Sequence, residues 1–435
     1  MHNHRLPLAA GLALLLGACG GPGPAKDDSL RHFGQLGFKP CTLSGAGASG
    51  NVEAQCATFD VPENPAEPQG RKISLNVAWL PASNNVVATP DPVFFLAGGP
   101  GQAATEVAAL VNPSLREIRK QRDLFFIDQR GTGKSNPLDC LGEDGKELPI
   151  DELRQPSVEL VQDYAQRCAK SLLGRADTRF YTTTEAIGDL DAVRAALGVD
   201  KVNLIGGSYG TRVAQQYAAR FPQHTRSVVL DGVAPNDLVV GGGECAGTFE
   251  DALKLQSAQC AKLPACKARF PVDTRQQLRN VMDRLQAAPV EVEFRDPSTG
   301  ESRRDMVTSD ALVGLAFAFS YAPQTASLLP LVLDEADKGR YAPLMSLSQL
   351  MTNGGMAGKM NRGMQWSVIC AEDADRFDAS TAPTDTILGP EVAKMFFAAC
   401  PVWATGKRPA DFTKPFASEL PVLLLSGELD PVTPP

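Results

Sequence analysis

Apolar positions along much of the chain form short continuous runs, separated by helical or turn-rich stretches. Short apolar runs bounded by turns are typical of strands buried on both faces of a parallel sheet. Two of the intervening stretches, 185–197 and 211–220, carry apolar residues at helical spacing. The alternation predicts an α/β fold with a doubly wound, mostly parallel sheet. The predicted strands span residues 73–80, 92–97, 124–128, 202–206, 227–231 and 421–426.

This alternation stops after residue 235, and helical patterns take over until the last predicted strand. The stretches 248–262, 275–287 and 309–320 have helical spacing, while 352–362 is rich in glycine and polar residues. We therefore expect a helical lid domain, residues 236–411, inserted into the α/β core. The core itself is predicted to span 41–235 and, as an incomplete second part, 412–435.

Length and charge narrow the class of protein further. A chain of 435 residues is long enough for two packed units, and its hydrophobic content of 43% supports a large buried core. The formal net charge is −8 and no basic run stands out, so nucleic acid is not an expected partner.

The first residues resemble a targeting segment. His2, His4 and Arg5 precede an apolar run over 6–16, which is too short to cross a bilayer but fits a signal peptide. The run ends in Cys19, as in bacterial lipoprotein signals, where that cysteine becomes the lipid anchor. We expect a signal peptide over 1–19, a tether over 20–40, and a periplasmic or membrane-anchored lipoprotein that touches the membrane only through the lipid. A plain signal peptide with Cys19 incidental is the alternative.

Cysteine usage fits export, because ten cysteines in an exported chain indicate disulfide bonds. Cys245 is left unpaired when near neighbours are joined. The chain has no CxxC pair and no histidines at ligand spacing, so no metal site is expected. Proximity along the chain suggests the pairs Cys41–Cys56, Cys140–Cys168, Cys260–Cys266 and Cys370–Cys400.

The segment 206–210, Gly-Gly-Ser-Tyr-Gly, directly follows one predicted strand and directly precedes a predicted helix. A serine at such a sharp turn is exposed as a nucleophile, and small neighbours at Gly206 and Gly210 avoid collisions. We predict Ser208 as the nucleophile and the backbone N–H of Tyr209 as one oxyanion donor. A glycine-rich turn that only redirects the chain is the alternative.

Two further loops follow predicted strands. Gly-Gly-Pro-Gly at 98–101 lets backbone N–H groups approach a ligand, and Gly99 is predicted as the second oxyanion donor. The segment 128–135 ends in Gly-Lys-Ser but lacks the first glycine of a phosphate loop, so nucleotide binding is not expected. Asp128 and Arg130 are expected to brace this loop.

Together, the segments 98–101, 128–135, 206–210 and 229–232 (Val-Leu-Asp-Gly) resemble, in this order, the proline iminopeptidase and tripeptidyl aminopeptidase family of α/β-hydrolases. The resemblance implies an α/β-hydrolase fold and a serine peptidase without cofactor that acts on peptides with a free N-terminus. It also implies that Asp430, in Gly-Glu-Leu-Asp-Pro, is the catalytic acid, with Asp231 as the rival at another strand end. Ala97 replaces the histidine usual in iminopeptidases, which favours the tripeptidyl-aminopeptidase-like members.

The catalytic histidine of this family would follow the acid, and the sequence ends at Pro435. His224 falls in a helix-to-strand loop, where a solvated or packing role is expected. A nucleophilic serine needs a base. We therefore expect a C-terminally truncated sequence that is inactive, or nearly so, as given.

Glu372 is a further candidate, because an aminopeptidase needs a negative group to bind the substrate ammonium; a surface charge is the alternative. Two other functions remain open. The first is an esterase or other acyl hydrolase of the same fold, and the second is a non-catalytic scaffold lipoprotein.

Overall fold

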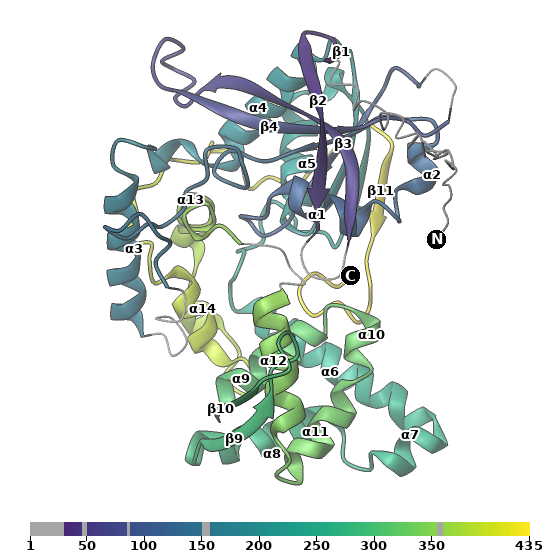
Figure 1. The fold of residues 1–435 in the computed structure, drawn as a ribbon, viewed down its shortest axis with the longest axis vertical. Helices are drawn as coiled ribbons and strands as arrows, with labels where there is room; N and C mark the ends of the chain where they lie inside the picture. Colours follow the sequence, from purple (N-terminus) through teal and green to yellow (C-terminus); the bar gives the residue numbers. More distant parts are fainter. Residues whose placement is uncertain (1–29, 46–49, 85–87, 150–156, 355–359) are drawn as a thin grey trace, which may run out of the picture.

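A nine-stranded sheet lies at the centre of this computed structural model, which describes residues 30–45, 50–84, 88–149, 157–354 and 360–435, the side chains of 352–354 excepted (Figure 1). The strand order is β1-β2-β3-β4-β6-β5-β7-β8-β11. The ladders from β1 to β6 are antiparallel, whereas β6, β5, β7, β8 and β11 run parallel. The strands are β1 (Arg31–Phe33), β2 (Leu36–Ser44), β3 (Asn51–Pro62), β4 (Lys72–Leu80), β5 (Val93–Leu96), β6 (Leu124–Ile127), β7 (Val202–Gly207), β8 (Thr225–Asp231) and β11 (Val422–Leu425).

Both faces of the sheet are apolar and covered. Phe94 and Phe125 face one core with residues of α4 and α5, whereas Phe95 and Phe126 face a second core with residues of α1. Because successive side chains of a strand point to opposite faces, a continuous apolar run buries both. The six predicted strands and the predicted fold class, an α/β-hydrolase sheet with an inserted lid, are confirmed.

Helices cover the sheet and build the lid. A capping box at Thr182 and Glu185 begins α4. The helices are α1 (Ala104–Val111), α2 (Arg116–Arg119), α3 (Val158–Leu172), α4 (Thr183–Ala196), α5 (Tyr209–Arg220), α6 (Glu244–Lys262), α7 (Pro264–Arg269), α8 (Thr274–Ala287), α9 (Ser309–Phe319), α10 (Pro323–Ala326), α11 (Leu329–Asp337), α12 (Ala342–Gly354), α13 (Arg362–Glu372) and α14 (Gly389–Phe397), with 3₁₀ turns η3 (Thr178–Phe180), η4 (Pro222–His224), η5 (Ala374–Arg376) and η6 (Ala379–Thr381).

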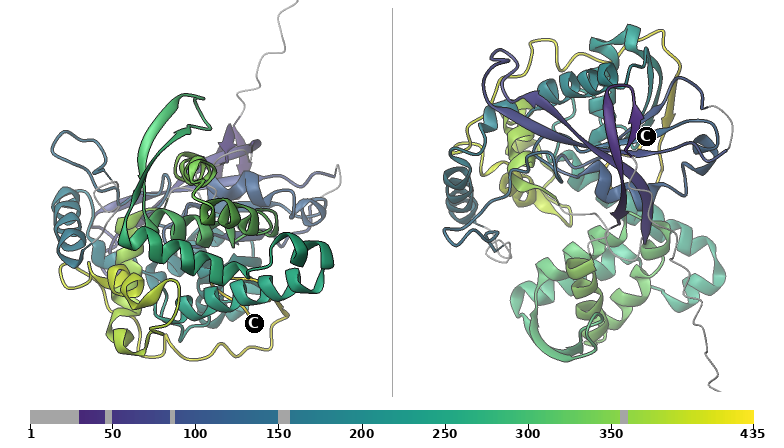
Figure 2. Two further views of the ribbon diagram at one scale, coloured as in Figure 1. Left: turned by 90° about the horizontal axis from the view of Figure 1, so that it is seen from below. Right: turned by 45° about the horizontal axis from the view of Figure 1, so that its top comes forward.

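The lid has an apolar core of its own, separate from those of the sheet. Side chains from α6, α8, α9, α11 and α12 form it, together with Phe294 and Val307 of a hairpin. This hairpin, β9 (Val290–Arg295) and β10 (Ser302–Val307), adds strands to a region predicted to be helical. Figure 2 shows the lid from two further sides, packed at one end of the sheet.

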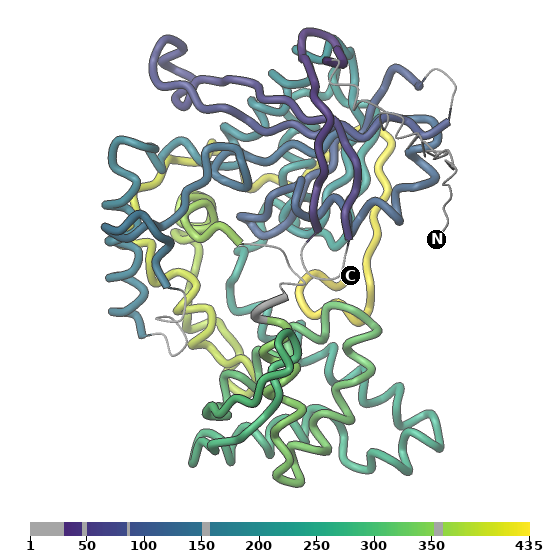
Figure 3. Tube along the Cα trace, viewed as in Figure 1, coloured from purple at the N-terminus to yellow at the C-terminus, as the bar shows by residue number. Residues whose placement is uncertain are grey.

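The predicted lid boundary at residue 411 is too late. Helices α13 and α14 lie beside α3, and α14 runs from there toward the lid (Figure 3). Met364, Trp366 and Ile369 of α13 and Phe397 of α14 pack in the same core as α4 and α5. Helices α13 and α14 therefore belong to the hydrolase core, whereas Ile387 and Leu388, between them, pack in the core of the lid.

The predicted tether over 20–40 is wrong for residues 31–40. These residues form β1 and the beginning of β2, and Phe38 is fully buried. Gly34, with φ of +57°, makes the turn that pairs the two strands. The sheet therefore begins about ten residues before the predicted start of the core at residue 41, and well before the first predicted strand, 73–80.

Four disulfide bonds join Cys41 to Cys56, Cys140 to Cys168, Cys260 to Cys266 and Cys370 to Cys400, which confirms the predicted pairs. Cys245 is a free thiol. In the described ranges, no helix has the length and hydropathy needed to span a bilayer. The predicted signal peptide and Cys19 lie outside the described residues.

Candidate active site

Ser208 stands at a sharp turn between β7 and α5. Its backbone has φ of 53° and ψ of −125°, outside the regions that non-glycine residues normally adopt. Such a conformation costs about 1–3 kcal/mol and persists only where the surroundings impose it. The Ser208 amide donates to the carbonyl of Asp231 at 2.9 Å, and Thr211 donates to the Ser208 carbonyl through its N–H at 2.8 Å and its hydroxyl at 2.6 Å. The side chain is only partly buried, so a substrate can reach it.

The glycines on either side of this turn are required by close backbone contacts. A Cβ on Gly206 would lie 2.3 Å from the carbonyl oxygen of Gly210. A Cβ on Gly210 would lie 2.2 Å from the carbonyl oxygen of Leu96, on the neighbouring strand. The turn is a nucleophile elbow, because strand, serine and helix meet with no room for larger neighbours.

The 98–101 loop lies against the elbow. β5 pairs in parallel with β7, so the loop after β5 reaches the same edge of the sheet as Ser208. A Cβ on Gly98 would lie 3.2 Å from the Cβ of Ser208. Gly99 and Gly101 have φ of +113° and +112°, which favours glycine at both positions. The structure therefore brings Ser208 and the predicted donor loop together.

Residues 360–361, where the chain leaves the lid, also contact this loop. The amide of Asn361 donates to the carbonyl of Gly101 at 3.0 Å, and the Met360 sulfur would lie 3.0 Å from a Cβ on Gly99. Across the elbow, the amide of Tyr209 is the first of α5 and has no carbonyl of a preceding helical turn to bind. Both predicted donors, Gly99 and Tyr209, are thus carried by backbone adjoining Ser208.

Asp430 lies on the loop after β11, at the same edge of the sheet. Its Oδ1 accepts hydrogen bonds from the amides of Val432 and Thr433, each at 2.9 Å, and its Oδ2 accepts from the Thr433 hydroxyl at 2.9 Å. These three donors fix the orientation of the carboxylate. On the lid side, the Thr248 hydroxyl donates to the carbonyl of Pro431 at 2.6 Å, so α6 contacts the acid loop.

Asp231 is close to both the elbow and Asp430, yet its surroundings differ. It pairs with Gly207 across the β7–β8 ladder, and a Cβ on Gly232 would lie 3.5 Å from Oδ2 of Asp430. Partial burial and the charge of Asp430 raise the pKa of Asp231. A triad acid has to remain ionised, and the raised pKa of Asp231 argues against that role for Asp231.

In the part of the chain that the structure describes, neither histidine lies beside Ser208. His224 follows α5 at the end opposite Ser208, and the 12 residues of that helix span about 18 Å. Its Nδ1 lies 2.7 Å from Oδ1 of Asp191, which holds the ring away from the elbow. His32 is exposed on β1, at the far side of the strand order. Within the described ranges, no cluster of three or more His, Cys, Asp or Glu could hold a metal ion.

Asp128 and Arg130 do brace the 128–135 loop, as expected. Asp128 is fully buried and accepts from Asn76, from Thr105 twice and from the amide of Lys134. Arg130 forms a two-pronged ion pair with Asp189, with both N–O distances at 2.7 Å. The pair is buried, so it fixes the loop after β6 to helix α4 without exposing either charge to a substrate.

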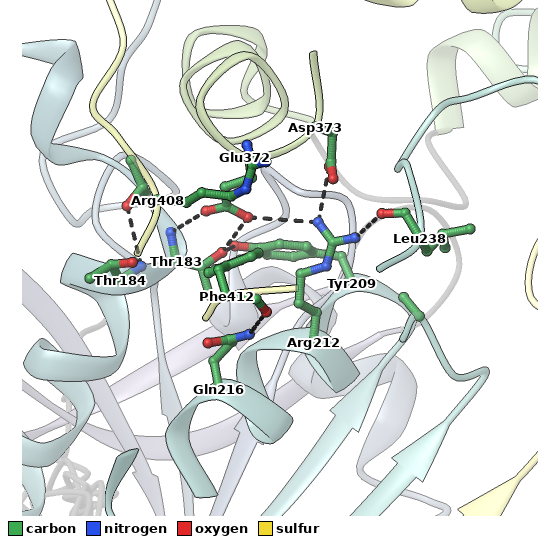
Figure 4. A network of polar contacts seen from close by, with 12 residues as sticks. Thr183, Thr184, Tyr209, Arg212, Gln216, Leu238, Glu372, Asp373, Arg408 and Phe412 are labelled. Carbon is green, nitrogen blue, oxygen red and sulfur yellow. Dashed lines mark hydrogen bonds and ion pairs between the residues drawn. The ribbon is translucent and has the colours of Figure 1, made fainter. Parts of the chain in front are cut away.

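Glu372 does not face a substrate. Its side chain is fully buried at the C-terminal end of α13, and both of its oxygens accept from Thr183, one from the amide at 2.8 Å and one from the hydroxyl at 3.0 Å (Figure 4). Arg212 lies 3.7 Å away. Glu372 is therefore no surface charge, and the contacts that its carboxylate makes in this structure are internal ones, with Thr183 and Arg212.

Sequence reasoning missed two residues that support the elbow. Thr183 lies between Glu372 and the phenol of Tyr209, and Gln129 donates to the same phenol at 3.2 Å. Gln129 belongs to the 128–135 motif, so its place beside the site could have been noticed. Thr183 could be recognised from the sequence only as a residue near the start of a helix. Its role in the site could not be seen, because its partners come from distant parts of the sequence.

The sheet order, the strained serine and the donor loop together define the class of protein as α/β-hydrolase. A family described as "alpha/beta hydrolase fold" matches residues 91–250. The serine protease Hip1 of Mycobacterium tuberculosis is 26% identical over 422 residues, which cover 91% of this chain and 80% of that protein. Tripeptidyl aminopeptidase of Streptomyces lividans is 30% identical over 190 residues, 41% of this chain and 35% of that protein. The solved proline iminopeptidase of Mycobacterium smegmatis aligns with a TM-score of 0.33 and 16% identity, over 81% of this chain and 90% of that one.

The chain has the α/β-hydrolase fold, and these relatives confirm the resemblance of its motifs to the proline iminopeptidase and tripeptidyl aminopeptidase family.

Proposed function

We propose that the protein is an exported aminopeptidase that cleaves short peptides at a free N-terminus through an acyl-Ser208 intermediate. The observation that carries this proposal is the Ser208 elbow, which has the 98–101 loop on one side and the Asp430 loop on the other. The relatives named as a serine protease and a tripeptidyl aminopeptidase support a peptide as the substrate.

The proposed reaction begins with attack of the Ser208 oxygen on the peptide carbonyl carbon. The amides of Gly99 and Tyr209 donate to the oxygen that becomes negative in the tetrahedral intermediate. The carbon–nitrogen bond then breaks, and the released amine takes up the proton that Ser208 lost. Water next attacks the acyl-serine ester and regenerates the hydroxyl. Asp430 is the proposed acid that orients and stabilises the protonated base.

The proton of Ser208 needs a base, and neither described histidine can reach it. We therefore propose that the 435-residue chain reacts slowly by itself and faster with imidazole in solution. A positioned general base contributes about 10²–10⁴-fold to such reactions, so imidazole should raise the rate on the order of tenfold or more. A rise of this size would show that Ser208 becomes reactive once a base is supplied.

The test uses anilides of one tripeptide, with the terminal amine either free or acetylated, and a short-chain ester, all with imidazole present. Faster release of aniline from the free-amine substrate supports an aminopeptidase. Equal rates on the free and acetylated substrates would contradict the aminopeptidase proposal. Turnover of the ester alone would instead indicate the esterase alternative.

Export and lipid attachment at Cys19 belong to the same proposal, and the four disulfide bonds support an oxidising compartment. Cys19→Ala is expected to move the protein from the membrane fraction to the soluble fraction, because the variant lacks the thiol that carries the lipid. Fractionation of the producing cells, followed by immunoblotting, measures this shift. A variant that stays with the membranes as the parent does would contradict the anchor.

A further inference from the structure

A buried chain of hydrogen bonds joins the end of α13 to the first residue of α5 (Figure 4). Glu372 accepts from the amide and the hydroxyl of Thr183, at 2.8 and 3.0 Å. The Thr183 hydroxyl lies 2.6 Å from the phenol oxygen of Tyr209. Gln129 donates to that phenol at 3.2 Å. Helices α13, α4 and α5 therefore meet at one internal network next to the nucleophile.

The direction of these hydrogen bonds follows from the donors. The amide nitrogen of Gln129 can only donate, so the Tyr209 oxygen accepts from it and the phenol proton points to Thr183. The Thr183 hydroxyl then donates to Glu372, which accepts as an ionised carboxylate. Burial, with the charge of Glu372 as a smaller cause, raises the pKa of Tyr209, so the phenol keeps its proton. With Glu372 ionised, each of these protons has an acceptor.

We propose that Glu372 is a positioning residue of the oxyanion site, which acts through Thr183 and the phenol of Tyr209 on the Tyr209 amide. This inference rests on the proposed function, because it concerns the same backbone donor. Tyr209 is the first residue of α5 and the immediate neighbour of Ser208. Its side chain is 2% exposed, so the network holds the residue from inside the protein while its amide adjoins the nucleophile.

The negative and positive side chains around Glu372 are nearly equal in number. Arg212 of α5 lies 3.7 Å from Glu372 and 2.9 Å from Asp373, and Arg376 of η5 pairs with Asp373 at 2.5 Å. Arg408, on the loop before β11, has its pKa raised mainly by Asp375 and, among smaller causes, by Glu372. Even so, burial raises the pKa of Glu372 to about 7, with Asp373 adding to the rise and Arg212 opposing it.

The ionisation of Glu372 sets the state of the network. Above pH 7 the carboxylate is charged and the sequence of donors is complete. Below pH 7 the added proton reverses the Thr183 hydroxyl, which then donates to Tyr209. The phenol proton of Tyr209 is left without an acceptor among the described residues. Because an unpaired buried donor is unfavourable, the Tyr209 side chain is held less firmly. The oxyanion amide is therefore best held above pH 7.

The first test compares Thr183→Val with Thr183→Ser. Valine keeps the shape and removes the hydroxyl, whereas serine keeps the hydroxyl. Loss of a whole oxyanion donor costs about 10²–10³-fold, so a displaced donor should slow Ser208 labelling by a fluorophosphonate about tenfold in the valine variant. The serine variant should label within about threefold of the parent on the same scale. Thermal unfolding of each variant checks that the fold is kept.

The second test compares the parent with Glu372→Gln across pH. The amide of glutamine imitates the protonated acid, so the ratio of parent to variant labelling rates should be close to one at pH 5.5 and about ten at pH 8.5. Taking the ratio cancels titrations that the two proteins share. Should Glu372→Gln fail to fold, the threonine pair decides the question.

The outcomes separate the two claims. A parent chain that is not labelled at Ser208, with or without imidazole, overturns the proposed function. A parent that is labelled, together with equal rates for Thr183→Val and Thr183→Ser or a flat pH ratio, overturns only the positioning role.

Discussion

Ser208→Ala is expected to abolish labelling of the protein by a fluorophosphonate and hydrolysis of the tripeptide anilide in the presence of imidazole. The alanine keeps the turn but removes the only oxygen at the elbow that can attack. Since triad residues act as a unit, the variant should lose the whole rate that imidazole restores, about tenfold or more. Mass spectrometry of the labelled protein, with the anilide assay beside it, measures both effects.

Ser83→Ala is the matched control. Ser83 is exposed after β4, and its amide bonds to Arg119 at the edge of the sheet opposite the elbow. Its removal should leave both the labelling and the hydrolysis unchanged. Labelling of another serine in the Ser208→Ala variant, at the rate of the parent, would contradict the assignment of the nucleophile.

Gly210→Ala is expected to destabilise the fold by about 3 kcal/mol or more, the upper part of the range for an added methyl in a packed site. The new Cβ would lie 2.2 Å from the carbonyl oxygen of Leu96 and 2.7 Å from that of Ala97. Both are backbone atoms of β5 and the loop it feeds, so neither can turn aside as a side chain would. Urea unfolding measures the free energy, and labelling of Ser208 should fall with it.

Gly207→Ala provides the comparison within the same turn. A Cβ on Gly207 meets no described atom within 4 Å, so this variant should unfold within about 1 kcal/mol of the parent. Similar decreases in the free energy of unfolding for Gly207→Ala and Gly210→Ala would show that the elbow does not depend on the close approach of α5 to β5.

The parallel half of the sheet and the elbow could be predicted from the sequence, because both depend on short-range patterns. An apolar run such as 124–127 is buried on both faces whichever strand it pairs with. The glycines at 206 and 210 report a steric requirement that is local to one turn. Disulfide pairs were also predictable, since each joins cysteines that are close in the sequence.

Long-range packing explains what the sequence did not reveal. Residues 31–40 lack a continuous apolar run, and their strands exist because β2 pairs with β3 and Phe38 enters the main core. The helical pattern of α13 is the same whether it packs in the lid or beside α3. Glu372 carries a charge that suggested a substrate contact, and only the fold shows Thr183 and Arg212 around it.

The chain returns from the lid directly onto the loop that is proposed to hold the oxyanion. Asn361 bonds to Gly101 there, and one residue later α13 enters the core. Because the Asn361 amide donates to the Gly101 carbonyl and α13 begins one residue later, a shift of α13 relative to the sheet would carry the Gly101 backbone with it. The oxyanion loop and the beginning of α13 are therefore expected to move as one unit.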